Sequence, residues 1–249
     1  MLRILAAFTF FTRLPFWKIQ SIPAECFKTV VNYWTLTGWL TAGVTAGSLW
    51  LAAQVLPHSV AVLIAILARL LLTGAFHEDG LADFLDGFGG GTNREKTLAI
   101  MKDSHIGSYG VIGLIFYFGL YYLLLSSLSP LIVFAVILAA DPWSKFCAAQ
   151  IINRLPYARK EEESKSKVIY NRMTPATFSI SFLAGVIPVL LFLPVKLWWA
   201  CLLPLVTFWF LSSLMKKRLQ GYTGDCCGAT FLLCEVSFYL GVLILVYHY

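Results

Sequence analysis

The sequence predicts an all-α, polytopic transmembrane bundle of about seven spans, with a helix at the membrane interface before the first span. Hydrophobic residues make up 59% of the 249 residues and charged residues 13%, whereas soluble globular domains carry about 25% charged residues. Apolar runs long enough to cross a bilayer, about 20 residues each, recur along the chain. This composition excludes intrinsic disorder, which needs low hydrophobicity, and disfavours a soluble enzyme.

The first element expected is an amphipathic helix over residues 1–28 that lies on the membrane surface. Its basic residues, Arg3, Arg13, Lys18 and Lys28, would form the wet side. No small-residue cleavage site follows its short apolar stretch, so the segment does not resemble a secretory signal peptide.

Seven apolar runs follow, and we expect them to form a single integral membrane domain over residues 1–249. The predicted spans are 33–56, 59–76, 107–126, 130–150, 176–194, 197–215 and 228–247. Short turns alternate with long charged connections at 77–106, 151–175 and 216–227.

The charge distribution predicts how the chain is oriented. Of its 19 Lys and Arg residues, Arg69 and Lys145 fall inside spans and Lys196 in a short turn, so the others share the side of the N-terminus and the long connections. By the positive-inside rule that side is cytoplasmic. We therefore expect a multi-pass protein of the cytoplasmic (inner) membrane, with the catalytic loop 77–106 in the cytoplasm. Insertion also explains the net charge of +6, so no nucleic-acid partner is expected.

One stretch concentrates acidic residues at the cytoplasmic end of a span. Asp79, Asp83 and Asp86 are spaced i, i+4, i+7, which places them on one face of a helix. Stacked carboxylates repel each other, and Mg²⁺, which prefers oxygen ligands and substrate phosphates, would relieve that repulsion. The alternative is a solvated acidic helix end beside a positive helix N-terminus.

The residues after this cluster suggest further contacts. The run Gly87-Phe-Gly-Gly-Gly91 is expected to end the helix and to let a phosphate approach the backbone at Gly89 and Gly90, although a plain loop is an equal alternative. Residues Arg94–Ser104 predict a short amphipathic helix ending at Asp103. Asp103 would complete the metal shell or cap the next span.

Other charged residues lie at or inside the spans. Asp225 precedes the last span and would act as an N-cap or as a ligand beside the acidic cluster. Glu235 lies about two turns deeper, where an acid usually faces a polar interior. Arg69, Asp141 and Lys145 are embedded as well, and Asp141 and Lys145 are spaced to pair with each other.

These residues resemble the family of adenosylcobinamide-GDP ribazoletransferases, also called cobalamin-5′-phosphate synthases. The resemblance is carried by Phe11-Thr-Arg-Leu-Pro15, His77-x-Asp-Gly-Leu-Ala-Asp-x-x-Asp-Gly87, Ile100-Met-Lys-Asp-Ser-x-Ile-Gly107, Leu155-Pro-Tyr-Ala-Arg159 and Tyr222-Thr-Gly-Asp-x-x-Gly-Ala229. It implies a membrane enzyme that joins α-ribazole, or its 5′-phosphate, to adenosylcobinamide-GDP and releases GMP, with Mg²⁺ as cofactor. Membrane lipid is an expected partner; homo-oligomers and complexes with other cobamide-assembly enzymes are left open.

The pattern and the resemblance together give one mechanistic hypothesis. The expected metal ligands are Asp79, Asp83, Asp86 and Asp103. The expected catalytic residues are Asp83, Asp86, Asp103 and Asp225. Asp103 or Asp225 would take the proton from the 5′ oxygen of ribazole. The expected substrate contacts are His77, Arg13, Lys102, Arg159, Gly89 and Gly90; for His77, local hydrogen bonding at a helix end is an equal alternative.

Two other functions compete with this hypothesis. CDP-alcohol phosphotransferases share the Asp-x-x-Asp-Gly signature, but the Ala-Arg pair that follows their glycine is missing after Gly87. A transporter would use embedded charges as a polar pathway and show paired halves. In this sequence the acids gather at one rim instead.

Overall fold

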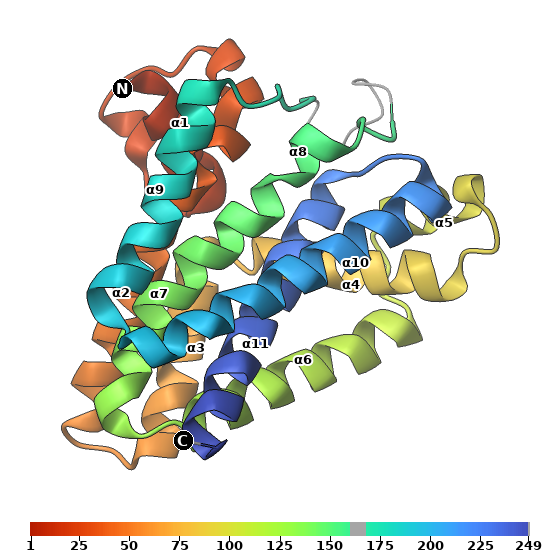
Figure 1. Cartoon of the computed structure of the whole chain (residues 1–249). Coiled ribbons are helices and arrows are strands. Elements are labelled where there is room, and N and C mark those ends of the chain that lie inside the picture. Colours follow the sequence, from red (N-terminus) through yellow and green to blue (C-terminus); the bar gives the residue numbers. More distant parts are fainter. Residues whose placement is uncertain (160–167, 249) are drawn as a thin grey trace.

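The computed structural model describes residues 1–159 and 168–248 as a bundle of helices (Figure 1). Its elements are α1 (Leu2–Phe11), η1 (Phe16–Lys18), η2 (Ala24–Tyr33), α2 (Trp34–Ala53), α3 (His58–Thr73), α4 (Phe76–Gly90), α5 (Arg94–Lys102), α6 (Ser108–Ser127), α7 (Pro130–Ala149), α8 (Ile151–Arg154), α9 (Pro175–Phe192), η4 (Val195–Cys201), α10 (Leu202–Leu219) and α11 (Gly224–His248). An isolated parallel bridge joins Tyr157 to Tyr222. The predicted all-α class is confirmed. Part of the predicted 151–175 connection, residues 160–167, lies outside the described residues.

Five stretches of described helix are long and apolar enough to cross a membrane. They are α6, α7 with α8, α9, η4 with α10, and α11. The bent pair α3 and α4 makes a sixth candidate. The expectation of about seven spans therefore holds approximately. The remaining predicted span is α2, which is 20 residues long but carries four threonines and three glycines, and these lower its hydropathy.

The N-terminal segment differs from the single helix expected over residues 1–28. The helix α1 ends at Phe11, and two 3₁₀ segments, η1 and η2, follow it. Pro15 and Pro23 directly precede η1 and η2, and proline fixes φ and offers no N–H to continue an α-helix. The α1 helix packs on η2 and α2, where the ring of Phe11 stacks on Trp34 at 4.9 Å.

A sharp bend separates α3 from α4. Gly74 and Ala75 both adopt left-handed backbone conformations, with φ of 69° and 55°, and α4 leaves α3 at 90°. Glycine tolerates this region, whereas alanine does so at a cost. The α4 helix then continues through Gly87, Phe88 and Gly89 and ends at Gly90, so the run does end the helix, but the expectation that its glycines cannot be helical is wrong.

Close packing explains why the glycines stay helical. A Cβ atom on Gly87 would lie 2.4 Å from Met101 Cγ of α5, and one on Gly89 would lie 2.5 Å from the ring of Tyr109 of α6. These glycines therefore let α5 and α6 approach α4, and that packing offsets the low helix propensity of glycine.

The α11 helix lies at the centre of the bundle, against α4, α7 and α10. The α7 helix, in addition to its contact with α11, packs against α2 and α9. Gly38 of α2 allows close contact there, because a Cβ atom would lie 2.8 Å from Pro142 Cα. The α7 helix is continuous from Pro130 to Ala149 with Pro142 inside it, as the predicted span 130–150 requires.

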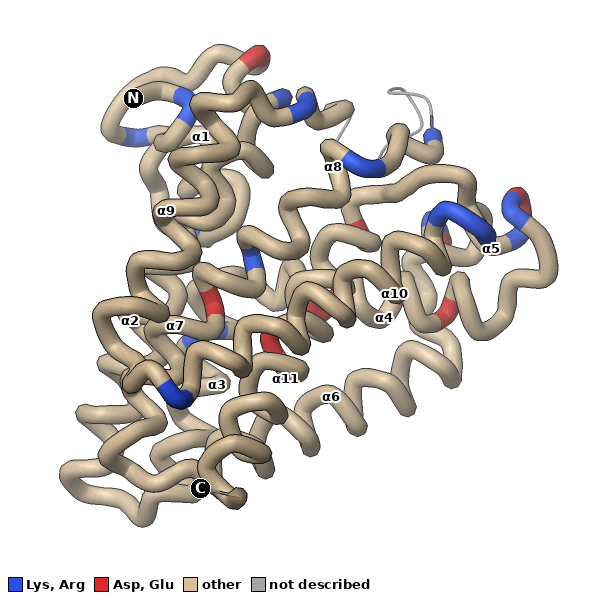
Figure 2. The backbone as a smooth tube through the Cα atoms, viewed as in Figure 1, with Lys and Arg blue, Asp and Glu red and all other residues tan. Residues whose placement is uncertain are grey.

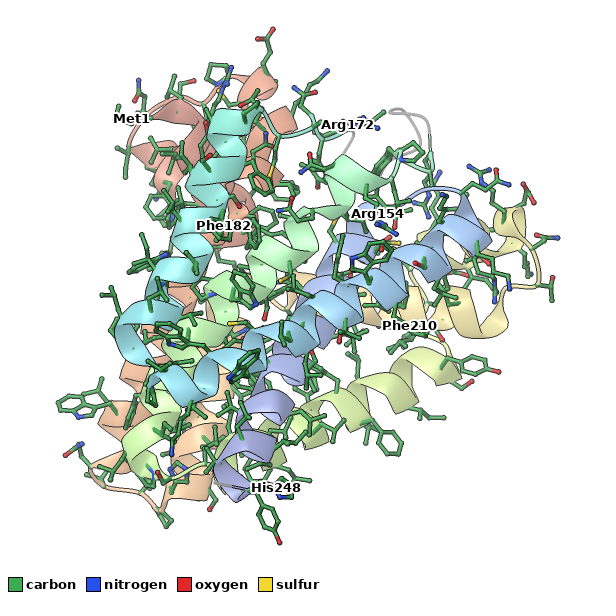
Figure 3. All side chains as sticks on the ribbon, viewed as in Figure 1. Met1, Arg154, Arg172, Phe182, Phe210 and His248 are labelled. Carbon is green, nitrogen blue, oxygen red and sulfur yellow. The ribbon has the colours of Figure 1, made fainter. Side chains whose placement is uncertain are left out.

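Charged residues are unevenly distributed over the bundle. Figure 2 shows Lys and Arg gathered around the N-terminal segment, α8 and α5, whereas the end that carries the C-terminus has few. Figure 3 shows Met1, Arg154 and Arg172 toward the end that is rich in Lys and Arg, and His248 at the opposite end. The two termini therefore lie at opposite ends of the bundle.

Candidate active site

The three aspartates of α4 form one helical stripe, as their spacing predicts. Along the stripe the side chains pass from exposed Asp79 through half-buried Asp83 to buried Asp86. Asp86 is only 8% exposed. The stripe therefore reaches different surroundings at its two ends.

A cavity of about 300 Å³ opens at the Asp79 end. It is lined by Phe10, Phe76, Asp79, Gly80, Tyr157, Arg159, Tyr170, Gly224, Asp225 and Gly228. Of the residues predicted to contact metal or substrate, Asp79, Asp225 and Arg159 meet here from three separate parts of the chain. The cavity thus combines two carboxylates and a guanidinium with aromatic rings.

The bridge between Tyr157 and Tyr222 brings two of these parts together. Ala158 N donates to Tyr222 O at 2.8 Å, and Tyr222 N donates to Pro156 O at 3.0 Å. Arg159 follows the bridge by two residues on one strand-like segment, and Asp225 follows it by three on the other. The bridge therefore fixes both side chains at the same cavity.

Two glycines bring α4 against the start of α11. A Cβ atom on Gly80 would lie 3.1 Å from Asp225 Cα, and one on Gly228 would lie 3.2 Å from His77 O. Contacts this short leave little room for a side chain. Asp79 and Asp225 share a cavity because the two helices approach closely here.

Arginines tie the surrounding connections together. Arg159 Nη2 donates to Leu98 O of α5 at 2.9 Å. Arg94 donates from Nη2 to Ala158 O at 2.7 Å and from Nε to Leu219 O at 2.9 Å. Backbone carbonyls from three segments are satisfied by these two side chains, which fixes α5 beside the cavity.

A second cavity, of about 330 Å³, opens at the other end of the stripe and is lined by Asp86, Gly90, Asp103 and His105 among others. Asp103 Oδ1 accepts a hydrogen bond from His105 N at 3.0 Å and lies 2.7 Å from the ring Nδ1 of His105. The backbone hydrogen bond, followed by the contact with the ring, lowers the pKa of the Asp103 carboxyl. A lowered pKa makes Asp103 a weaker proton acceptor.

Asp86 occupies the N-terminus of α6. Its Oδ2 accepts from Gly107 N at 2.7 Å and its Oδ1 from Gly110 N at 2.8 Å. It therefore satisfies two amide groups that the helix itself leaves unpaired. Sequence reasoning gave this capping role to Asp103 as an alternative; the structure shows Asp86 in that place instead.

His77 is buried against aromatic rings. Its imidazole stacks on Phe11 at 5.9 Å and on Trp34 at 5.5 Å, and Phe231 packs edge-on at 5.0 Å. Neither ring nitrogen has a hydrogen-bond partner among the described residues. The alternative of a locally hydrogen-bonded histidine is therefore wrong, and the substrate contact stays a prediction.

Of the remaining predicted contacts, only Gly90 belongs to the described lining of these two cavities. Arg13 sits at the bend before α4, where its N donates to Leu72 O at 2.8 Å. Lys102 is the exposed last residue of α5. Gly89 faces Tyr109, whereas Gly90 lines the second cavity.

The donor set of the first cavity suits Mg²⁺. Within residues 1–159 and 168–248, no three His, Cys, Asp or Glu side chains are grouped as a complete metal shell. The four aspartates expected to share one ion include Asp79 at one cavity and Asp86 and Asp103 at the other. Mg²⁺, however, is commonly held by one or two carboxylates together with substrate phosphates, and Asp79 with Asp225 provides that number.

The embedded charges pair with one another inside the bundle. Lys145 Nζ lies 2.6 Å from Asp141 Oδ1, which confirms the expected i, i+4 pair. Arg69 pairs with Glu235 at 2.6 Å and approaches Glu78 at 4.0 Å. Each of these embedded charges therefore has an oppositely charged partner within the bundle.

Comparison with known proteins decides the family. The family model for cobalamin-5-phosphate synthase matches residues 3–243. The chain belongs to the cobalamin-5-phosphate synthase family. Its relatives include an adenosylcobinamide-GDP ribazoletransferase of Leptospira interrogans, 36% identical over 97% of this chain and 95% of that protein. A Shewanella relative of the same name is 38% identical over 96% of this chain and 93% of its own length. No solved structure matches the chain.

Three of the segments that carry the sequence resemblance meet at the first cavity, those containing Asp79, Arg159 and Asp225. Sequence reasoning missed the aromatic lining. Tyr157 lies inside the motif Leu155–Arg159, so its part in the site could have been predicted, whereas Phe10 and Tyr170 lie in segments without a chemical pattern. It also missed Glu78, which faces Arg69 on the buried side of α4.

Proposed function

We propose that this member of the synthase family joins ribazole, or its phosphate, to adenosylcobinamide-GDP and releases GMP. The observation that carries the proposal is the meeting of Asp79, Asp225 and Arg159 in one cavity. Two carboxylates beside a guanidinium suit a reaction on a diphosphate, because the guanidinium matches phosphate geometry and a carboxylate accepts a proton.

In the proposed reaction, a ribose hydroxyl forms a bond to the phosphorus that carries cobinamide. The bond from that phosphorus to the GMP oxygen breaks, and the hydroxyl proton passes to the carboxylate of Asp79 or Asp225. The family description names a 5-phosphate product. A product keeps that phosphate only if another hydroxyl attacks, so we replace the 5′ oxygen of the sequence hypothesis with a different ribose oxygen.

Mg²⁺ is part of the proposal. Asp79 and Asp225 would hold it, and Asp83, one turn along α4, stays a predicted ligand. When bound, Mg²⁺ supplies positive charge to the diphosphate oxygens and to the departing GMP. Arg159, fixed by its hydrogen bond to Leu98 O, would hold a phosphate oxygen from the other side.

We also propose that the bundle spans the inner membrane and that its basic end lies on the cytoplasmic side. Lys and Arg concentrate at that end (Figure 2), and the positive-inside rule places such an end in the cytoplasm. Outward-facing apolar side chains such as Ile115 and Phe116, 66% and 67% exposed, would contact membrane lipid.

The direct test is incubation of the purified protein in nanodiscs with adenosylcobinamide-GDP, α-ribazole and Mg²⁺. Chromatography should show a cobalamin product and GMP in equal amounts. Formation of neither compound would contradict the proposal. Turnover of CDP-diacylglycerol would favour the CDP-alcohol phosphotransferase alternative.

A further inference from the structure

The aromatic part of the first cavity points to one of the two substrates. Phe10 of α1 packs edge-to-face on Phe76 of α4 at 5.4 Å and on Tyr170 at 6.3 Å. Phe76, which lines the cavity, is 44% exposed. All three rings line the cavity, so it presents aromatic surface that a flat ligand could cover.

The volume of the cavity limits the ligand to a small one. At about 300 Å³ it lies at the lower end of the range for ligand pockets, roughly 300–1,000 Å³. A nucleoside is of suitable size, whereas the corrin macrocycle is far larger. Both the ribazole nucleoside and the guanosine half of the donor meet this size limit.

The apolar wall formed by Phe10 and Phe76, rather than the lining as a whole, distinguishes these two nucleosides. Guanine carries a carbonyl, an amino group and a ring N–H, and burying them without hydrogen bonds is costly. The dimethylbenzimidazole base of ribazole has no exocyclic polar group and presents methyl groups at its edge. Phe10 and Phe76 offer no hydrogen-bonding atoms, so this wall suits the benzimidazole better.

We propose that this cavity is the acceptor site, in which the base of ribazole lies against Phe10, Phe76 and Tyr170 and a ribose hydroxyl faces Asp79 and Asp225. The inference rests on the proposed function and names the substrate of this subsite. Phe10 and Tyr170 then determine specificity for the acceptor, and one of the two carboxylates receives its hydroxyl proton.

The test measures the KM for each substrate separately. Phe10→Leu keeps apolar volume but removes the ring, and base–aromatic stacking predicts about a tenfold rise in the KM for ribazole with an unchanged KM for adenosylcobinamide-GDP. Tyr170→Leu should do the same, whereas Tyr170→Phe, which keeps the ring, should retain the wild-type value. Phe210→Leu, on an outward-facing residue of α10 that is 67% exposed, is the matched control.

The outcomes distinguish the inference from the proposed function. A raised KM for adenosylcobinamide-GDP alone would place guanosine in the cavity and overturn the inference, as would unchanged KM values in active variants. Calorimetry of α-ribazole binding without donor gives a readout independent of turnover. If the wild type binds ribazole, Phe10→Leu binds it about tenfold more weakly, and no product forms, then only the proposed function fails. A variant that unfolds is replaced by the Tyr170 pair.

Discussion

Arg69 of α3 donates hydrogen bonds to both carboxylate oxygens of Glu235 of α11, at 2.7 and 2.6 Å, in the interior of the bundle. The two residues are 2% and 1% exposed. Tyr121 accepts from the same guanidinium at 2.9 Å, and Tyr239 donates to Glu235 at 3.1 Å. The cluster joins four helices, α3, α4, α6 and α11, since Glu78 of α4 also lies 4.0 Å from Arg69. We infer that it holds α4 against α11 beneath the candidate site.

Removal of one charge from this pair should destabilise the protein strongly. Arg69→Met leaves Glu235 buried without its main partner, which typically costs about 3–5 kcal/mol. Arg69→Met combined with Glu235→Gln should recover much of this loss, because Glu235 is then neutral and only Glu78, the more distant of the two acids, has lost its charged partner. Thermal unfolding in detergent measures both variants; a single variant as stable as wild type would contradict the structural role.

Asp79→Asn and Asp225→Asn should each lower turnover at least about a hundredfold while the protein stays folded, because each removes a carboxylate from the cavity. Glu95→Gln is the matched control: it lies on α5 at the same end, and its side chain is 77% exposed. GMP release measures the effect. Near-normal turnover by both asparagine variants would rule out the proposed assignment.

Asp83→Asn tests the middle of the stripe. If Asp83 is a metal ligand, as its position one turn from Asp79 predicts, GMP release should be abolished without loss of protein from the membrane. Substantial turnover would restrict the metal site to Asp79 and Asp225.

Asp86 should contribute mainly to stability through its two hydrogen bonds to the start of α6. Asp86→Ala is expected to lower the free energy of unfolding by about 1–2 kcal/mol, as for the loss of a helix cap. Denaturation of the two proteins side by side checks this value. Equal free energies of unfolding for Asp86→Ala and the wild type would mean that these two hydrogen bonds do not contribute to stability.

Chelation should abolish turnover reversibly. Dialysis against EDTA removes the ion that two carboxylates and the substrate phosphates would share, and added Mg²⁺ should restore GMP release. Activity that persists in chelated, metal-free buffer would exclude the proposed cofactor.

Much of the helical framework could be predicted from sequence, because long apolar runs and their charged connections follow directly from the requirements of a bilayer. The ranges for α6, α7, α9 and α11 agree with the structure within a few residues. The prediction of one helix over residues 1–28 was wrong because it passed over the effect of Pro15 and Pro23 on an α-helix. The prediction that Gly87–Gly89 are not helical was wrong because it considered the helix propensity of glycine without the packing of Met101 and Tyr109.

The acids of the site were predictable, but their grouping was not. The spacing of Asp79, Asp83 and Asp86 predicts that they share one face of α4. It does not predict which helices pack beside that face. The distance between Asp79 and Asp225 in the chain is bridged by tertiary contacts at Gly80 and Gly228. The same contacts decide that Asp86 serves α6, which local sequence patterns do not reveal.

The right-angle turn at Gly74 and Ala75 has a consequence for how two unlike substrates meet. In the proposed orientation, α4 would run across the direction of α3 and along the boundary of the lipid layer, so its acidic face would not descend into that layer. A bulky corrinoid can then stay partly among acyl chains while its nucleotide end remains in water, and neither half has to cross the bilayer to react.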